Sequence, residues 1–172
     1  MKRLGEEAQM EWEIEIRHLY RSDGHRFVGR HGKQPLDFPM TVCEQIECIS
    51  GKGIVGDRYF DYRRDYKGQL TLFSYEVFQN LNQHFGIDDR GPQVFRRNVI
   101  VSGVDLNRLI GRTFRIGGVE LSGVEEAKPC YWMNQAYCEG AEAWLRGLGG
   151  LRARILTDGE LTLGRERLEI VE

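Results

Sequence analysis

The residues best suited to chemistry lie in residues 125–134, where Cys130 directly follows Lys128 and Pro129. A neighbouring cation raises the thiolate fraction of a cysteine, and the amino end of a helix adds partial positive charge. Because a strand-like pattern gives way here to a helix-like one, Cys130 is a credible nucleophile, sulfur carrier or ligand of a soft metal. The alternative is a small apolar side chain buried beside a loop. This segment alone supports the two interpretations about equally.

Other reactive side chains form no recognisable site in the sequence. The four histidines are scattered over segments of different expected structure, and the remaining cysteines lack the spacing of a structural zinc site. No nucleophile elbow, phosphate-binding P-loop or dinucleotide fingerprint is present, which removes the commoner enzyme classes. The residues considered are His18, His25, His31 and His84, with Cys43, Cys48 and Cys138.

Length and charge favour a single domain. The 172 residues are enough to bury a core without disulfide or metal staples, and we expect one domain over residues 1–172. A net charge of -2 creates no strong field that would favour nucleic acid or an anionic membrane, so any anion site must be local. Four irregularly spaced cysteines do not suit a secreted disulfide scaffold, and no apolar run suits a membrane span or signal peptide. We therefore expect a cytoplasmic protein with reduced thiols.

Short alternating or β-branched segments predict a mainly β protein. Trp12, Ile14 and Ile16 alternate with charged residues, which indicates a half-exposed first strand. A Gly-Gly pair at 117–118 is the strongest hairpin signal, and an Asp-Gly pair at 158–159 predicts a second hairpin. Many short strands with few helices favour a closed or nearly closed β-barrel, because closure removes exposed edges. The expected strands are residues 12–17, 40–49, 96–103, 113–116, 119–124, 152–156, 161–163 and 168–171.

Two main helices complete the predicted fold. Ser74 and Gly86 suit the start and the end of the first helix, whose apolar residues recur at helical spacing. The second helix is expected over residues 134–147, although Gly140 weakens its middle. Residues 51–58 hold three glycines, which predicts a backbone with positive φ angles or one that closely approaches another group.

Several segments, taken in their order along the chain, resemble the MOSC domain, which is named for the C-terminal domain of molybdenum cofactor sulfurase. Each segment alone is weak evidence for the family, whereas the ordered set of segments is fairly specific to it. The resemblance covers about residues 14–172, so the chain is similar to a stand-alone MOSC protein with a MOSC-type barrel. The matching segments are residues 53–58, 97–106, 109–111 leading into 114–117, the Pro129-Cys130 pair, and 149–156.

The resemblance implies that Cys130 is the signature residue of the family. In that role it carries sulfur as a persulfide or ligates the molybdenum of a bound pterin cofactor, molybdopterin. Thiolate is a soft, anionic ligand of the kind that such a metal accepts from a cysteine. The phosphate of the cofactor needs charge-assisted donors, and the planar fork of arginine suits phosphate oxygens. The implied cofactor-binding residues are Asp57, Arg58, Arg97, Asn98, Lys128, Arg152 and Arg154.

The four arginines in adjacent or alternate positions can be compared by their expected faces. Alternation along a strand allows only one of Arg96 and Arg97 to face the site, and Arg97 is preferred because it lies within a matched segment. Arg152 and Arg154 are expected to share a face. Two like charges on one face need solvent or an anion between them, which modestly favours a site.

Other candidates also have structural interpretations. Asp57 and Arg58 follow a glycine turn, so a turn aspartate with a local ion pair is as good an interpretation as a site role. Trp132 and Tyr131 fit a core or a pocket wall better than a stacking platform. Tyr59 stands where the family often has histidine, and tyrosine is a poor base at neutral pH.

Larger members of the family carry a sulfurase domain with a pyridoxal-phosphate lysine, or an N-terminal extension in the amidoxime-reducing proteins. We identify no such lysine here, and we expect neither part in this chain. Sulfur would then have to come from a partner such as a cysteine desulfurase, and electrons from an external electron-transfer protein. The resemblance thus implies sulfur transfer or the reduction of N-hydroxylated compounds. The alternative is a non-catalytic binding module for a small anion or a partner peptide, in which Cys130 is a passive thiol.

Overall fold

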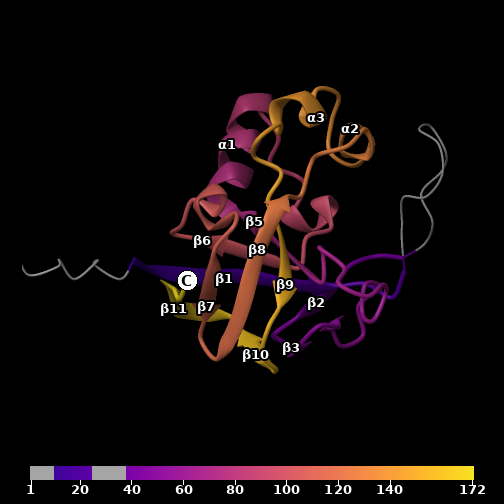
Figure 1. Ribbon diagram of the computed structural model, residues 1–172. Coiled ribbons are helices and arrows are strands. Elements are labelled where there is room, and N and C mark those ends of the chain that lie inside the picture. The colour runs from indigo at the N-terminus through magenta and orange to yellow at the C-terminus, as the bar shows by residue number, and fades with distance from the viewer. Residues whose placement is uncertain (1–9, 25–37) are drawn as a thin grey trace, which may run out of the picture.

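Seven strands of the computed structural model close into a β-barrel, which confirms the predicted fold class (Figure 1). The structure describes residues 10–24 and 38–172, so His25 and His31 lie outside the described residues. The barrel strands are β1 (Glu11–Arg21), β5 (Leu70–Ser74), β6 (Val99–Ser102), β7 (Thr113–Ile116), β8 (Val119–Glu126), β9 (Leu151–Ile155) and β11 (Gly164–Ile170). Around the ring they follow the order β1, β11, β7, β8, β9, β5, β6, and β6 pairs again with β1. The β5–β6 pair is parallel and the other six pairs are antiparallel.

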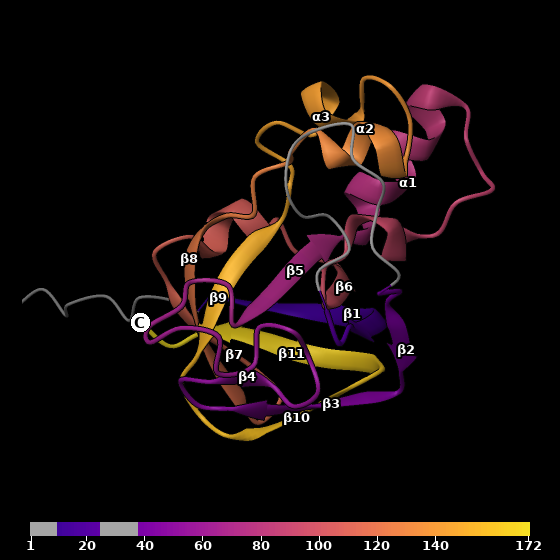
Figure 2. The ribbon, with the colours of Figure 1, turned by 90° about the vertical axis from the view of Figure 1, so that its right-hand side faces the viewer.

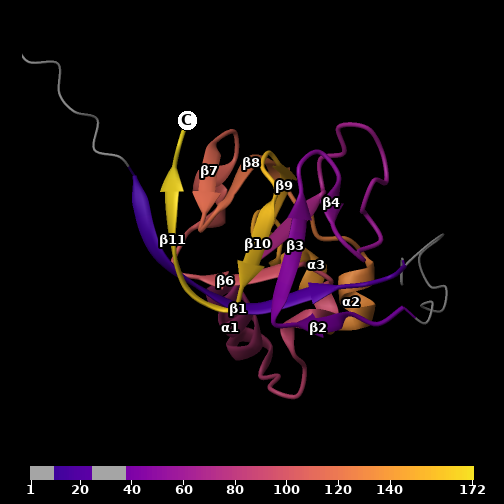
Figure 3. The same ribbon diagram turned by 90° about the horizontal axis from the view of Figure 1, so that it is seen from below.

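A second, three-stranded sheet lies on the side of the barrel away from the helices (Figures 1 and 3). It contains β3 (Gln45–Ile49), β4 (Gly53–Ile54) and β10 (Gly159–Thr162), in the order β10, β3, β4. The short strand β2 (Thr41–Cys43) extends the larger sheet by pairing with the C-terminal end of β1.

The predicted hairpin around residues 158–159 is wrong. Strand β9 is already paired on both edges, with β8 and with β5, so it has no free edge for β10. Strand β10 pairs with β3 instead. The side chain of Asp158 contributes to this arrangement, because its Oδ1 accepts a 2.7 Å hydrogen bond from the amide of Ser50. By contrast, the hairpin predicted at residues 117–118 is present as β7 and β8.

The first predicted helix is confirmed as α1 (Tyr75–Phe85). The Ser74 hydroxyl accepts a 3.2 Å hydrogen bond from the amide of Val77, which is the expected N-cap. Gly86 ends the helix with φ 64°, and its amide donates to the carbonyl of Asn82. Two 3-10 helices, η1 (Pro92–Phe95) and η2 (Leu106–Leu109), lie before and after β6.

The second predicted helix is wrong as a single element. The chain forms two short helices, α2 (Trp132–Ala136) and α3 (Ala141–Trp144). Gly140 adopts φ 94°, a left-handed conformation that interrupts the helix where the sequence weakens it. The side chain of Asn134 holds the two parts together by accepting a 2.9 Å hydrogen bond from the amide of Glu142.

Two groups of apolar side chains build the core. One fills the barrel interior, with Ile16, Leu72 and Phe114 among its fully buried members. The other joins the outer face of the barrel to the helices, which gather at one end of it (Figure 2). The second group includes Tyr20, Phe73, Phe78, Leu81, Phe95, Ile100, Met133, Tyr137, Ala141 and Leu145.

No helix of the described residues is long and apolar enough to span a lipid bilayer.

Candidate functional site

Cys130 lines a cavity of about 240 Å³ that is rich in positive charge. Five of the eleven lining residues are cationic, and none is Asp, Glu or His. Such a lining favours an anionic ligand, because opposite charges attract strongly where water is partly excluded. We call it the Cys130 cavity. Its lining residues are Arg58, Tyr59, Val94, Phe95, Arg96, Arg97, Lys128, Cys130, Trp132, Met133 and Arg152.

Cys130 itself is exposed, which excludes the interpretation of a small side chain buried beside a loop. It follows the end of β8 and precedes α2, and its carbonyl accepts a 2.9 Å hydrogen bond from the amide of Met133. Helix α2 spans only five residues, so its dipole adds little to the local potential. The positive charge around the thiol therefore comes from the cationic side chains that share its cavity.

Arg97 holds together the backbone segments that form the cavity wall. Its Nη2 donates to the carbonyl of Ala127 at 2.8 Å, and its Nε donates to the carbonyl of Gly149 at 3.1 Å. A third bond, from Nη1 to the carbonyl of Phe95, measures 3.2 Å. Burial lowers the pKa of Arg97 to about 10, with the nearby Cys130 thiol acting in the opposite direction. At neutral pH Arg97 is therefore a cation that positions the Cys130 segment.

The turn at Gly149 and Gly150 can approach the Cys130 segment because it has no side chains. A Cβ at Gly149 would collide with the carbonyl oxygen of Ala127, and one at Gly150 would collide with that of Leu72. Gly150 also has φ 104°, which disfavours any residue but glycine. The amide of Gly149 donates to the Glu126 carboxylate at 3.0 Å. That amide is committed to Glu126 and does not donate to a ligand in the cavity.

Asp57 and Asn98 do not line the cavity, although sequence analysis placed both among the cofactor-binding residues. Asp57 is buried and forms a 3.1 Å ion pair with Arg58. Its carboxylate also accepts from the amides of Ser22 and Tyr59, at 3.0 and 3.2 Å, and from Nδ2 of Asn98 at 3.4 Å. Both residues thus act through others, because Asp57 pairs with Arg58 and Asn98 donates to Asp57.

Arg96 and Arg97 both line the cavity, so the expectation that strand alternation allows only one of them to do so is wrong. The physical reason is the backbone of Arg96, whose φ of 58° ends η1 before a strand begins. The guanidinium of Arg96 donates to the carbonyls of Phe38 and Gly24, at 2.7 and 2.9 Å, and to the Ser22 hydroxyl at 3.0 Å. Its buried charge is thereby held beside the cavity.

Arg152 and Arg154 have different environments. Arg152 lines the cavity, and its Nη1 lies 3.5 Å from Oε1 of Glu125 on the neighbouring strand. The other carboxylate oxygen of Glu125 pairs with Lys67 at 3.3 Å. Arg154 instead donates from Nε and Nη2 to the carbonyl of Asp65, and it does not line the cavity. Of this pair, Arg152 alone could bind a ligand in the cavity.

Tyr59 contributes an aromatic wall that sequence analysis did not include among the cofactor-binding residues. The guanidinium of Arg58 lies 4.7 Å from its ring centroid, and the ring stacks on Tyr66 at 5.0 Å. Tyr62 meets both rings edge-on. Burial raises the pKa of Tyr66 to about 12, so its phenol stays neutral. The close spacing of three tyrosines in residues 59–66 is the signal that identifies this cluster.

A metal in the cavity would have to bring other ligands with it. Within residues 10–24 and 38–172, no three His, Cys, Asp or Glu side chains gather in a way that could hold a metal ion. Cys130 is thus the thiolate ligand that the cavity offers, surrounded by cations that suit anionic groups. This donor set fits a metal that arrives within an anionic cofactor.

A family model for the MOSC domain matches residues 51–166, which include every residue that lines the Cys130 cavity. The chain belongs to the MOSC domain family. No curated protein matches the chain in sequence.

Solved structures support this fold at low sequence identity. The MOSC chain resembles the YuaD protein from Bacillus subtilis, with a TM-score of 0.73 and 19% identity over 95% of this chain and 100% of that one. It also resembles YiiM from Escherichia coli, with a TM-score of 0.61 and 16% identity over 95% of this chain and 70% of YiiM. YiiM from Geobacillus stearothermophilus gives the same TM-score and identity, over 92% and 75% of the two chains.

Proposed function

We propose that this MOSC domain binds molybdenum cofactor in the Cys130 cavity and that the Cys130 thiolate either ligates the molybdenum or carries sulfur. One observation carries the proposal: among the described residues, an exposed thiol shares a cavity with five cationic side chains and with no carboxylate. A passive thiol needs no such surroundings. Thiolate and phosphate are both anionic, so one cluster of cations can stabilise both the Cys130 thiolate and the phosphate of the cofactor.

The cationic residues divide into those that would contact the cofactor and those that hold the site together. Arg58, Lys128 and Arg152 would contact its phosphate, because all three line the cavity and ion pairs orient Arg58 and Arg152. Arg96 and Arg97 bond mainly to backbone carbonyls, and they would supply charge and rigidity. When bound, the cofactor supplies a redox-active metal.

The reaction would be sulfur transfer or the reduction of N-hydroxylated compounds. Within residues 10–24 and 38–172, no histidine or carboxylate lines the cavity, so hydrolytic chemistry with a conventional general base has no support from these residues. Sulfur would arrive from a cysteine desulfurase, or electrons from an electron-transfer protein. The exposed position of Cys130 supports either route, because a donor protein can reach the thiol.

The first test measures molybdenum and pterin in protein purified from a host that makes the cofactor. We expect both in the unaltered protein and a loss of molybdenum from Cys130→Ser. Cys138→Ser is the matched control, because Cys138 is only partly exposed and does not line the cavity. If the protein carries neither metal nor pterin, cofactor binding is wrong.

The second test addresses sulfur transfer without metal. After incubation with a cysteine desulfurase and cysteine, mass spectrometry should show one added sulfur atom on Cys130, transferred from the persulfide of the desulfurase to the Cys130 thiolate. Absence of both the cofactor and this persulfide would contradict the enzymatic proposal. The alternative is then a binding module with a passive thiol. It would be identified if Cys130→Ser binds phosphate as tightly as the unaltered protein does.

A further inference from the structure

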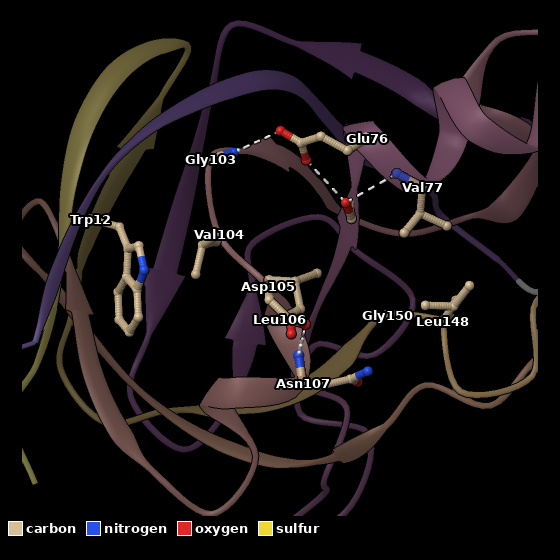
Figure 4. A pocket seen from close by; sticks show the side chains of 11 residues that line it. Trp12, Glu76, Val77, Gly103, Val104, Asp105, Leu106, Asn107, Leu148 and Gly150 are labelled. Carbon is tan, nitrogen blue, oxygen red and sulfur yellow. Dashed lines mark hydrogen bonds between the residues drawn. The ribbon is translucent and has the colours of Figure 1, made fainter.

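A second cavity, of about 450 Å³, lies where the start of α1, the end of β6 and the beginning of β1 meet η2 (Figure 4). Its volume is within the range of small-molecule sites. Apolar walls come from Trp12, Val77, Val104 and Leu148. Gly150 also lines it, so this cavity and the Cys130 cavity lie near opposite ends of the short segment from Gly150 to Arg152.

The charge of this second cavity is opposite to that of the Cys130 cavity. Among the described residues that line it, Glu76 and Asp105 are ionisable and none is Lys or Arg. We call it the acidic cavity. The two carboxylates would repel an anionic ligand, so the acidic cavity is unsuited to the ligand of the Cys130 cavity.

Both carboxylates are held in place by hydrogen bonds. Oε1 of Glu76 accepts from the amide of Gly103 at 2.8 Å, and its Oε2 accepts from the Ser74 hydroxyl at 3.1 Å (Figure 4). Oδ1 of Asp105 accepts from the amide of Asn107 at 3.0 Å. The second oxygen of Asp105, Oδ2, makes no hydrogen bond with any of the described residues. A negative charge with an available oxygen is thus fixed at the wall of the cavity.

Trp12 adds an aromatic wall to the cavity. The guanidinium of Arg108 lies 5.1 Å from the centroid of its ring system, although Arg108 itself is not among the residues that line the cavity. A tryptophan ring attracts positive charge through its quadrupole. Because Arg108 already contacts the Trp12 ring, the ring offers the cavity mainly an apolar wall.

We propose that the acidic cavity binds a small organic cation, with an ammonium group near Asp105 and Glu76 and an apolar body against Trp12 and Val104. A bare metal ion fits less well, because two exposed carboxylates supply too few fixed oxygen ligands and the walls are apolar. The two cavities then give one barrel separate places for an anion and for a cation. This inference does not depend on the function proposed for Cys130.

Three probes of similar shape and different charge test the proposal. Phenethylamine, phenethyl alcohol and phenylacetate are each titrated into the full chain, and the amide signals of Gly103 and Asn107 are followed by NMR. These amides report on the site because they bond directly to Glu76 and Asp105. We expect saturable shifts with the amine, and binding at least about tenfold weaker with the alcohol and the anion.

Two substitutions remove the charge while preserving the local hydrogen bonds. Asp105→Asn keeps a side-chain oxygen that can cap η2, and Glu76→Gln keeps an acceptor for the amide of Gly103. The double variant should bind the amine at least about tenfold more weakly, with an unchanged melting temperature. Cys130→Ser should bind it as the unaltered protein does.

The proposal is overturned if the alcohol binds as tightly as the amine, or if the double variant keeps full affinity for the amine. It is also overturned if shifts at millimolar amine do not saturate or if they centre on residues away from Gly103 and Asn107. Loss of amine binding in Cys130→Ser would contradict the separateness of the two cavities. None of these results depends on whether the Cys130 cavity holds molybdenum, so the two proposals can fail independently.

Discussion

Nη2 of Arg97 donates a 2.8 Å hydrogen bond to the carbonyl oxygen of Ala127, three residues before Cys130. Through its other bonds, the same guanidinium joins that carbonyl to those of Gly149 and Phe95. A cation that links three backbone segments has a structural effect apart from any ligand. Its charge still contributes to the potential of the Cys130 cavity, and the position of the thiol thus depends on Arg97 before any ligand binds.

Replacement of Arg97 should therefore affect stability as well as binding. Arg97→Ala leaves three carbonyls without their donor, and we expect the free energy of unfolding to fall by roughly 3 kcal/mol. Urea denaturation followed by circular dichroism measures this change. Arg154→Ala is the matched control, since the Arg154 side chain donates to one exposed carbonyl and should change the free energy of unfolding by less than about 0.5 kcal/mol. Equal effects of the two substitutions would contradict the structural role of Arg97.

Elements of this fold are predictable from the sequence where the interactions that determine them are local. Helix α1 was predictable because Ser74 and Gly86 act on their own helix, and the β7–β8 hairpin was predictable because its turn lies between its strands. The hairpin at residues 158–159 failed because pairing with β8 and β5, far away in the sequence, fills both edges of β9. No local pattern contains that information.

The candidate site was predictable in part for the same reason. Cys130, Arg58 and Arg152 lie in matched segments and also line the cavity. Arg96 was set aside because alternation assumes an extended backbone, whereas its φ is 58°. Asp57 is expected in the site but does not line the cavity, because a sequence does not distinguish a residue that touches a ligand from one that positions its neighbour.

Asp57 gives the second prediction, which concerns a residue that acts through Arg58. Asp57→Asn removes the charge partner of a buried guanidinium, so we expect the free energy of unfolding to fall by about 3 kcal/mol and phosphate to bind more weakly. Denaturation and calorimetric titration with inorganic phosphate measure the two effects. Asp89→Asn is the control, because it breaks an exposed pair with Arg90. It should lower the free energy of unfolding by less than about 1 kcal/mol and leave phosphate binding unchanged.

The third prediction concerns the pH dependence of stability. Burial raises the pKa of the Cys48 thiol to about 12, with the charge of Glu47 adding to the effect. In the unfolded chain this thiol ionises near its reference pKa of about 8.5. The unfolded state therefore binds fewer protons than the folded state between these values, and stability falls as pH rises through that window. Below it, the contribution of Cys48 is fully present.

A comparison of two pH values isolates this contribution. Between pH 7.5 and pH 10, the free energy of unfolding of the unaltered protein should fall by about 1 to 2 kcal/mol more than that of Cys48→Ala. Denaturation in a reducing buffer measures the difference. The substitution also leaves a cavity in the core, but that cost is the same at both pH values and cancels. Parallel curves for the two proteins would contradict the raised pKa.

Glu125 gives the last prediction, which concerns the availability of Arg152. The Glu125 carboxylate lies 3.5 Å from Arg152 and 3.3 Å from Lys67, so an anion in the Cys130 cavity must compete with it for Arg152. Glu125→Gln removes that competing charge while keeping the shape of the side chain. We expect inorganic phosphate to bind a few-fold more tightly at low ionic strength, and the gain to shrink as salt screens the charges. Calorimetric titration at two salt concentrations measures both effects.

The control for this last experiment is Glu120→Gln. Glu120 also pairs with an arginine, Arg115, at 3.2 Å, but neither residue lines the Cys130 cavity. A general gain of positive charge would tighten phosphate binding in both variants by similar amounts, whereas release of Arg152 would do so only in Glu125→Gln. An unchanged or lower affinity in Glu125→Gln would mean that Glu125 holds Arg152 in the position that binds the anion. Arg152 would then depend on Glu125 as Arg58 depends on Asp57.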